Sequence, residues 1–161
     1  MPFNLSSPGN SYSLTHLDAI IVDALHATAV DNNGLTLIPP TLLSFAETFS
    51  TDLASIGIHI PMITGLKATK NTLFLTVAGN ENEFVDAAGR PTSEGYRLEV
   101  SSSGITIAGA SPLGTWWGTR TVLQQAVLGD LKLPVGEGID APGWGERGMM
   151  VSDFICPKLL R

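Results

Sequence analysis

The side chains of this sequence that could perform chemistry are few and lie far apart along the chain. The three histidines, His16, His26 and His59, do not form the helical pair of histidines flanking a glutamate that binds catalytic zinc. No local arrangement of serine, histidine and aspartate indicates a nucleophilic triad, and the single cysteine, Cys156, has no partner for an internal disulfide. We therefore expect no catalytic residue, no metal site and no cofactor site in this chain.

A short acidic stretch is the next candidate for chemistry. Glu81, Glu83 and Asp86 are interspersed with two asparagines and followed by a glycine. This composition is more typical of a solvated loop than of a catalytic carboxylate pair or a calcium-binding loop. We expect these acids to lie at the surface.

Two adjacent tryptophans, Trp116 and Trp117, could stack on a sugar ring, because an aromatic face offers a large apolar contact area. Gly114 and Gly118 lie one helical turn apart in the same segment, so the predicted helix has a shallow face that can approach a sheet closely. This spacing favours packing over ligand binding, and we expect both tryptophans to belong to the core.

Arg147 is the one polar residue whose position favours a binding role. It lies between a glycine-rich connection and a short apolar run, where its planar five-donor guanidinium could reach a polar ligand such as the hydroxyls of a sugar. From the residues alone, the alternative of a solvated or ion-paired arginine stays open.

Two amphipathic helices are predicted. In the first, apolar residues recur at helical spacing after Pro39 and Pro40 and stop at Gly57. In the second, Ser111 is a suitable N-cap, Pro112 suits the first turn, and the apolar face continues until glycine 129.

Strands are predicted at residues 17–25 and 72–77, and a hairpin joins residues 96–100 to residues 105–107 through a serine-rich turn that ends in Gly104. This order predicts an α+β fold, an antiparallel β-sheet with two α-helices packed on one face. The other face of the sheet would then be open for docking. From Gly129 to Gly145 glycine and proline become frequent, which indicates an interdomain connection.

The composition excludes several classes of partner. With a formal charge of −6 and only 15% charged residues, the sequence lacks the basic surface that nucleic-acid binding requires. No stretch is long and apolar enough to cross a bilayer, and the first residues do not read as a secretory signal. We expect neither a nucleic acid nor a membrane as partner, and the compartment stays open.

Six stretches of the sequence resemble the amino-terminal, non-catalytic domain of family 20 glycoside hydrolases, the β-N-acetylhexosaminidases. The resemblance extends from about residue 72 to residue 151, is weaker before that and is absent after Asp153. The stretches are residues 94–100 (EGYRLEV), 104–107 (GITI), 111–118 (SPLGTWWG), 121–125 (TVLQQ), 139–142 (IDAP) and 147–150 (RGMM).

The resemblance implies a function for the longer protein. Enzymes of this family remove terminal N-acetylhexosamine from glycans or chitooligosaccharides by a retaining mechanism in which the acetamido group of the substrate replaces an enzyme nucleophile. Their catalytic Asp-Glu pair lies in a TIM barrel, beyond the last residue of this sequence. Arg147 matches the family arginine that binds hydroxyls of the terminal sugar. Ser152 stands where the family has an acid, and Asp153 would match it only after a shift of one residue.

We therefore expect residues 1–138 to form the small α+β domain and residues 139–161 to form a linker and the truncated start of a catalytic barrel. Such a chain would dock against a catalytic barrel and would be inactive alone, because one strand cannot build a site at the carboxyl-terminal face of a barrel. The alternative is a stand-alone module that binds a protein or a carbohydrate. Family members are often extracellular or lysosomal.

Overall fold

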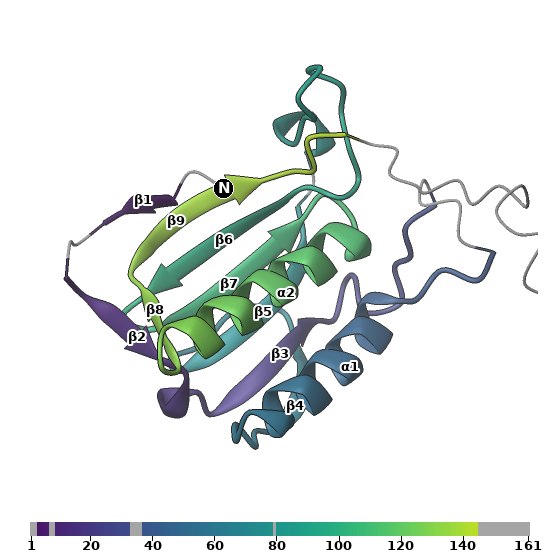
Figure 1. Ribbon diagram of the computed structural model, residues 1–161. Helices are drawn as coiled ribbons and strands as arrows, with labels where there is room; N and C mark the ends of the chain where they lie inside the picture. Colours follow the sequence, from purple (N-terminus) through teal and green to yellow (C-terminus); the bar gives the residue numbers. More distant parts are fainter. Residues whose placement is uncertain (1–2, 7–8, 33–36, 79, 145–161) are drawn as a thin grey trace, which may run out of the picture.

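The computed structural model describes residues 3–6, 9–32, 37–78 and 80–144. Seven strands form one mixed sheet in the order β1-β9-β6-β7-β5-β3-β4, and β2 pairs with β8 in a separate two-stranded sheet (Figure 1). The elements are β1 (Phe3–Leu5), β2 (Ser11–Ser13), η1 (Leu14–His16), β3 (Ala19–Asp23), α1 (Leu42–Ser55), β4 (Met62–Gly65), β5 (Thr72–Val77), η2 (Glu81–Glu83), β6 (Tyr96–Ser101), β7 (Gly104–Gly109), α2 (Pro112–Leu128), β8 (Lys132–Pro134) and β9 (Gly136–Asp140).

The prediction of an antiparallel sheet was wrong, because half of the sheet is parallel. The pairs β3–β4, β3–β5 and β5–β7 are parallel, and only β6–β7, β6–β9 and β1–β9 are antiparallel. The chain leaves β3, passes through α1 and returns into β4 in the same direction, as a crossover helix requires. Alternation within each strand identifies the strand but not the direction of its neighbour. The α+β class itself is confirmed.

Both predicted helices are confirmed, and each begins at a residue whose side chain caps it; the cap of α2 was predicted and that of α1 was not. Thr41 precedes α1, and its hydroxyl accepts a hydrogen bond from the backbone N–H of Ser44 at 3.1 Å. Ser111 caps α2 by accepting from the backbone N–H groups of Leu113 and Gly114. These caps satisfy amide groups that have no partner inside the helix.

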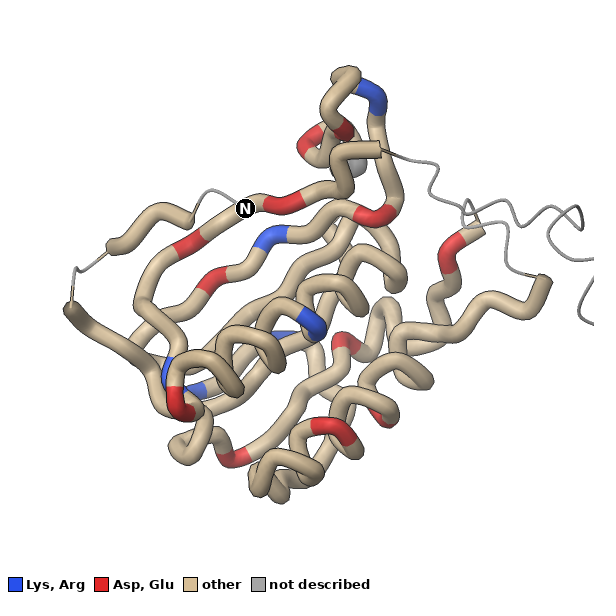
Figure 2. The backbone as a smooth tube through the Cα atoms, viewed as in Figure 1, with Lys and Arg blue, Asp and Glu red and all other residues tan. Residues whose placement is uncertain are grey.

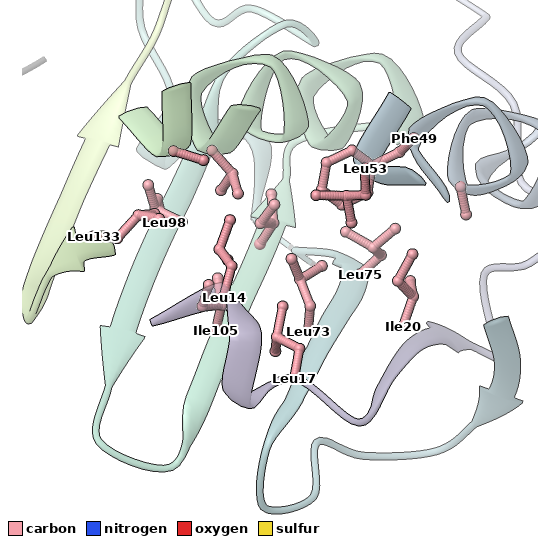
Figure 3. Close-up of a cluster of buried hydrophobic side chains, with 14 of the residues drawn as sticks. Leu14, Leu17, Ile20, Phe49, Leu53, Leu73, Leu75, Leu98, Ile105 and Leu133 are labelled. Carbon is pink, nitrogen blue, oxygen red and sulfur yellow. The ribbon is translucent and has the colours of Figure 1, made fainter. Parts of the chain in front are cut away.

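A single apolar core lies between the helices and the sheet (Figure 3). Alternate residues of the central strands point into it, and α1 contributes Phe49 and Leu53, both fully buried. α1 and α2 contact each other, α2 also contacts β5, β6 and β7, and α1 contacts β3, β4 and β5. The core side chains labelled in Figure 3 are Leu14, Leu17, Ile20, Phe49, Leu53, Leu73, Leu75, Leu98, Ile105 and Leu133.

The glycine- and proline-rich stretch after α2 contains two strands that the sequence did not predict. β8 pairs with β2, and β9 pairs with β6 along its whole length, from Gly136 to Asp140. Glycine and proline are infrequent in strands, so composition alone reads this stretch as a connection. The sheet includes residues 139 and 140, whereas the predicted linker and barrel start beyond residue 144 lie outside the described residues.

None of the helices in the described part of the chain is long and apolar enough to span a bilayer.

Candidate functional site

The residue predicted to bind a sugar, Arg147, lies outside the residues that the structure describes, as do Ser152 and Asp153. Its role therefore stays a prediction. The last residue of β9, Asp140, lies within the described residues.

A partly buried hydrogen-bond cluster holds the end of β9. The Tyr96 hydroxyl, at the start of β6, donates to Asp140 Oδ2 at 3.1 Å and lies 2.6 Å from the Thr121 hydroxyl of α2. Because the one proton of Tyr96 goes to Asp140, Thr121 must be the donor in the shorter bond. The cluster therefore joins a strand, a helix and the end of β9, after which the chain leaves the sheet.

Burial raises the pKa of Tyr96 to about 12; the Thr121 hydrogen bond opposes this shift, and the negative charge of Asp140 adds to it. The phenol is therefore neutral at physiological pH and acts as a donor. This arrangement suits a structural tie, whereas a catalytic phenol would need a lowered pKa to give up its proton.

A shallow pocket opens next to this cluster, between α2 and the end of β9. Its volume is about 370 Å³. The exposed Trp117 ring forms part of its wall, so the prediction that both tryptophans belong to the core was wrong for Trp117, which is 38% exposed. The lining residues are Glu94, Tyr96, Trp117, Arg120, Thr121, Gln124, Asp140, Ala141 and Pro142.

Trp116, in contrast, is half-buried and packs between α1 and α2, although it is not part of the buried core cluster. Its ring stacks on Phe45 of α1 with 5.1 Å between the ring centroids, and Cζ of the Arg120 guanidinium lies 3.6 Å from the centroid of the Trp116 ring. Arg120 also forms an ion pair with Asp52 of α1 at 2.6 Å. Stacking and charge pairing thus connect the two helices. No spacing rule relates positions 52 and 120, so the sequence did not reveal this contact.

The two glycines of α2 have the predicted packing role. A Cβ atom at Gly118 would lie 2.3 Å from Ile107 Cγ2, and one at Gly114 would lie 2.1 Å from the carbonyl oxygen of Gly95. The backbone of α2 therefore approaches the sheet too closely for any side chain at these positions.

Two of the three histidines that were considered as catalytic candidates, His16 and His26, have structural partners. The buried Asp23 carboxylate accepts from the Thr76 hydroxyl at 2.5 Å and lies 3.0 Å from Nδ1 of His26. The Tyr12 ring contacts the edge of His16. Within the described ranges, no three His, Cys, Asp or Glu side chains come together as a metal site.

The acidic stretch at residues 81–86 is a folded loop, and two of its acids pair with different arginines. Glu83 pairs with Arg97 of β6, and Asp86 pairs with Arg90 at 2.7 Å. Hydrogen bonds from the Arg90 side chain and backbone are the main reason that the pKa of Asp86 lies below its ordinary value. Asp86 is only 7% exposed, so the expectation that these acids lie at the surface was wrong for this residue.

Comparison with known proteins decides the family. The model of glycosyl hydrolase family 20, domain 2, matches residues 25–134. This chain belongs to glycosyl hydrolase family 20. The matched region extends from the turn after β3 to the end of β8, so it includes both helices and the centre of the sheet.

Two curated relatives contain the same domain within much longer proteins. A lacto-N-biosidase from Bifidobacterium bifidum is 26% identical over 148 residues, which are 91% of this chain but 12% of that protein. β-Hexosaminidase B from Pseudoalteromonas piscicida is 23% identical over 150 residues, 89% of this chain and 18% of that protein. The family 20 chain therefore spans less than a fifth of the length of either relative.

Solved structures share the fold at low sequence identity. The family 20 β-N-acetylhexosaminidase from Streptomyces coelicolor A3(2) matches 89% of this chain and 26% of its own, with a TM-score of 0.59 and 19% identity. The N-acetyl-β-hexosaminidase of Streptomyces plicatus matches 89% and 25%, with a TM-score of 0.54 and 18% identity.

Proposed function

We propose that this chain is the amino-terminal, non-catalytic domain of a β-N-acetylhexosaminidase and that its helix layer docks against the catalytic barrel. The helix layer is defined here as the outer surface of α1 and α2. The observation that carries the docking proposal is the outer face of α2, which exposes large apolar side chains, while Arg120 is the only charged residue between Pro112 and Leu128 (Figure 2).

The inner face of α2 is covered by the sheet, but its outer face also exposes large apolar side chains, beside Gln124 and Gln125. Trp117 is 38% exposed, Val127 66% and Leu128 74%. A helix that packs on one side only normally has a polar opposite face. Apolar groups on both faces indicate a second partner, because burying them removes apolar area from water.

Both helices lie on the viewer's side of the sheet in Figure 1, which supports the proposal that they cover a single face. On strands β6 and β9, the outward side chains of the other face include the exposed Glu99 and Glu137, which occupy directly opposite positions. A docking face that buried this pair would have to remove two like charges from water. The helix layer is therefore the better docking surface, in place of the open sheet face that the sequence suggested.

The role proposed for Arg147 rests on the family resemblance and on its place in the sequence after β9. The cluster of Tyr96, Thr121 and Asp140 fixes the end of β9 against α2, seven residues before Arg147 in the sequence. We assign to Arg147 the binding of hydroxyls of the terminal N-acetylhexosamine, in a site completed by the barrel. The catalytic Asp-Glu pair belongs to the barrel, so the 161-residue chain alone has no hydrolytic activity.

The decisive experiment is the intact mass of the endogenous protein, captured with an antibody against the β6–β7 hairpin and assayed with p-nitrophenyl N-acetyl-β-glucosaminide. We expect a product several-fold heavier than 17.0 kDa that hydrolyses the substrate, while the recombinant chain does not. A homogeneous endogenous product of 17.0 kDa would contradict the docking proposal, and turnover by the recombinant chain would contradict its inactivity.

Trp117 favours one second candidate, a carbohydrate-binding module. Its exposed ring borders a pocket that also contains carboxylate, hydroxyl and amide groups, a combination that suits a sugar. A thermal melt with saturating chitobiose separates the two functions, because a ligand that binds only the folded chain raises the midpoint. An unchanged midpoint would exclude the module.

A further inference from the structure

The edge strand β4 has features that suit pairing with a second copy of this chain. β4 is the last strand of the seven-stranded sheet as described, with β3 as its neighbour on one side (Figure 1). Residues 60–66, which include β4, carry no charged side chain. Natural edge strands are usually protected from association by charges, prolines or bulges. Here the one proline, Pro61, precedes the strand.

The hydrogen bonds to β3 determine which backbone groups of β4 point outward. The backbone N–H of Ile20 donates to the carbonyl of Pro61, and that of Ala24 donates to the carbonyl of Gly65. In a parallel ladder with the observed register, Ile63 lies between these two and also faces β3. The N–H and C=O groups of Met62 and Thr64 therefore point away from the sheet.

This pattern is self-complementary about Ile63. If a second β4 lies antiparallel with its Ile63 opposite Ile63 of the first, Met62 of each copy faces Thr64 of the other. Residues paired in this way exchange two hydrogen bonds, while Ile63 and its counterpart form the closer, non-hydrogen-bonded pair. A two-fold axis between the two Ile63 residues relates the copies. In this arrangement every outward N–H and C=O group of both β4 strands has a hydrogen-bond partner, and the same surface of each copy forms the contact, as in any isologous interface.

The exposed side chains in and next to β4 also favour pairing with a second copy. Ile63 is 50% exposed and Leu66 is 70% exposed, although both are large and apolar. In the antiparallel arrangement the two Ile63 side chains lie on the same face of the joined sheet and cover each other, and cross-strand β-branched pairs stabilise sheets. Neither residue belongs to the helix layer, so this contact leaves the proposed docking surface free.

We propose that two copies of this domain associate through β4, joining their sheets about a two-fold axis at Ile63. The strand has only four residues, so the number of hydrogen bonds is small and the dimer dissociates on dilution. This inference goes beyond the proposed function, because the helix layer plays no part in it.

Sedimentation velocity of the 161-residue chain over a concentration series tests the dimer. We expect the weight-average mass to rise from 17.0 kDa toward twice that value. Ile63→Lys places two positive charges opposite each other on the axis, and Thr64→Pro removes an outward N–H without affecting a bond to β3. Both variants should stay monomeric at every concentration while keeping the circular dichroism spectrum of the wild type.

Val127→Lys is the matched control, because it adds the same charge to an exposed apolar position of the helix layer. It should dimerise like the wild type. A wild-type chain that stays monomeric at the highest concentration would overturn the proposal, and so would a dimer that Val127→Lys disrupts and Ile63→Lys does not. Disruption by Val127→Lys alone would still be compatible with the docking proposal, because it would show that the helix layer is the surface through which the chain associates.

A cross-link tests the register directly and does not depend on either charged variant folding. In a Cys156→Ser background, Ile63→Cys should form an intermolecular disulfide on mild oxidation, since opposed Cβ atoms of a non-hydrogen-bonded pair lie within about 5.5 Å. Leu66→Cys is the control and should not cross-link. Equal cross-linking at both positions would contradict the two-fold axis at Ile63.

Discussion

At the scale of single residues, two buried tyrosines differ in the one property that decides their contribution to stability. The Tyr96 hydroxyl has two partners, Thr121 and Asp140. The Tyr12 hydroxyl is buried and has no hydrogen-bond partner among the described residues. A buried polar group costs free energy unless it is bonded, so the same substitution should act in different directions at the two positions.

Tyr96→Phe should lower the free energy of unfolding by about 1–3 kcal/mol, because it removes two hydrogen bonds and leaves the Asp140 carboxylate without this donor. Tyr12→Phe is the matched control and should leave stability unchanged or raise it. Urea unfolding of the two variants and the wild type measures both effects. An equal decrease in the free energy of unfolding for both variants would show that the Tyr12 hydroxyl does have a hydrogen-bond partner.

The buried carboxylate of Asp23 should make stability depend on acid pH. Burial raises its pKa, but hydrogen bonds from Thr76, His26 and the backbone N–H of Leu25, together with the charge of His26, lower it more, so that the pKa lies below its ordinary value. A folded-state pKa below the unfolded value stabilises the protein above the unfolded pKa. This stabilisation is lost as the pH falls through the folded pKa.

Asp23→Asn should therefore be less stable than the wild type at pH 7, and the difference should shrink as the pH is lowered below about 4. Glu47→Gln, on the exposed surface of α1, is the control and should show almost no difference at either pH. Thermal melts at a series of pH values give the comparison. A constant difference across the series would mean that the loss comes from geometry and not from the charge of Asp23.

At the scale of elements, the contact between α2 and the sheet depends on glycines. Gly118→Ala should lower the free energy of unfolding by about 1–3 kcal/mol, because the new Cβ would overlap Ile107 and the helix would have to move. Leu128→Ala, at an exposed position of the same helix, should change it by less than about 0.5 kcal/mol. Chemical unfolding measures both. A neutral Gly118→Ala would show that α2 can shift without cost.

The elements themselves were largely predictable because each has a local signal. Period and caps identified α1, α2, β3, β5 and the β6–β7 hairpin from sequence. β4 was missed because its four residues are too few to show a period, and β9 was missed because Gly136 and Gly138 look like a connection. Both strands depend on the hydrogen bonds of a neighbour. Their signal is therefore tertiary and absent from the local sequence.

At the scale of the whole molecule, the sequence indicated the fold class but not the strand directions. Parallel pairing of β3 with β4 and β5 follows from the path of the chain around α1, and no residue encodes it locally. The candidate site shows the same limit. Trp116 and Trp117 are adjacent and chemically identical, yet one contacts α1 and the other faces outward, because successive helical positions point in different directions.

The outward position of Trp117 leads to the last prediction, which concerns the assembled protein. If the catalytic barrel covers the helix layer, hydroxyl-radical labelling of Trp117 and Leu128 should be several-fold lower in the longer endogenous protein than in the 161-residue chain, because buried side chains are shielded from the reagent. Labelling measured by mass spectrometry at concentrations where the chain is monomeric gives the comparison.

Ile63 is the internal control for this measurement, because it is exposed on the opposite side of the fold from the helix layer. It should be labelled equally in both proteins. If Trp117 and Leu128 stay as reactive as in the isolated chain while Ile63 becomes protected, then the barrel covers the β4 side of the sheet. The apolar side chains on the outer face of α2 would then need a different partner. Apolar side chains that stay exposed to water in the longer protein contribute no hydrophobic free energy to the contact with the barrel.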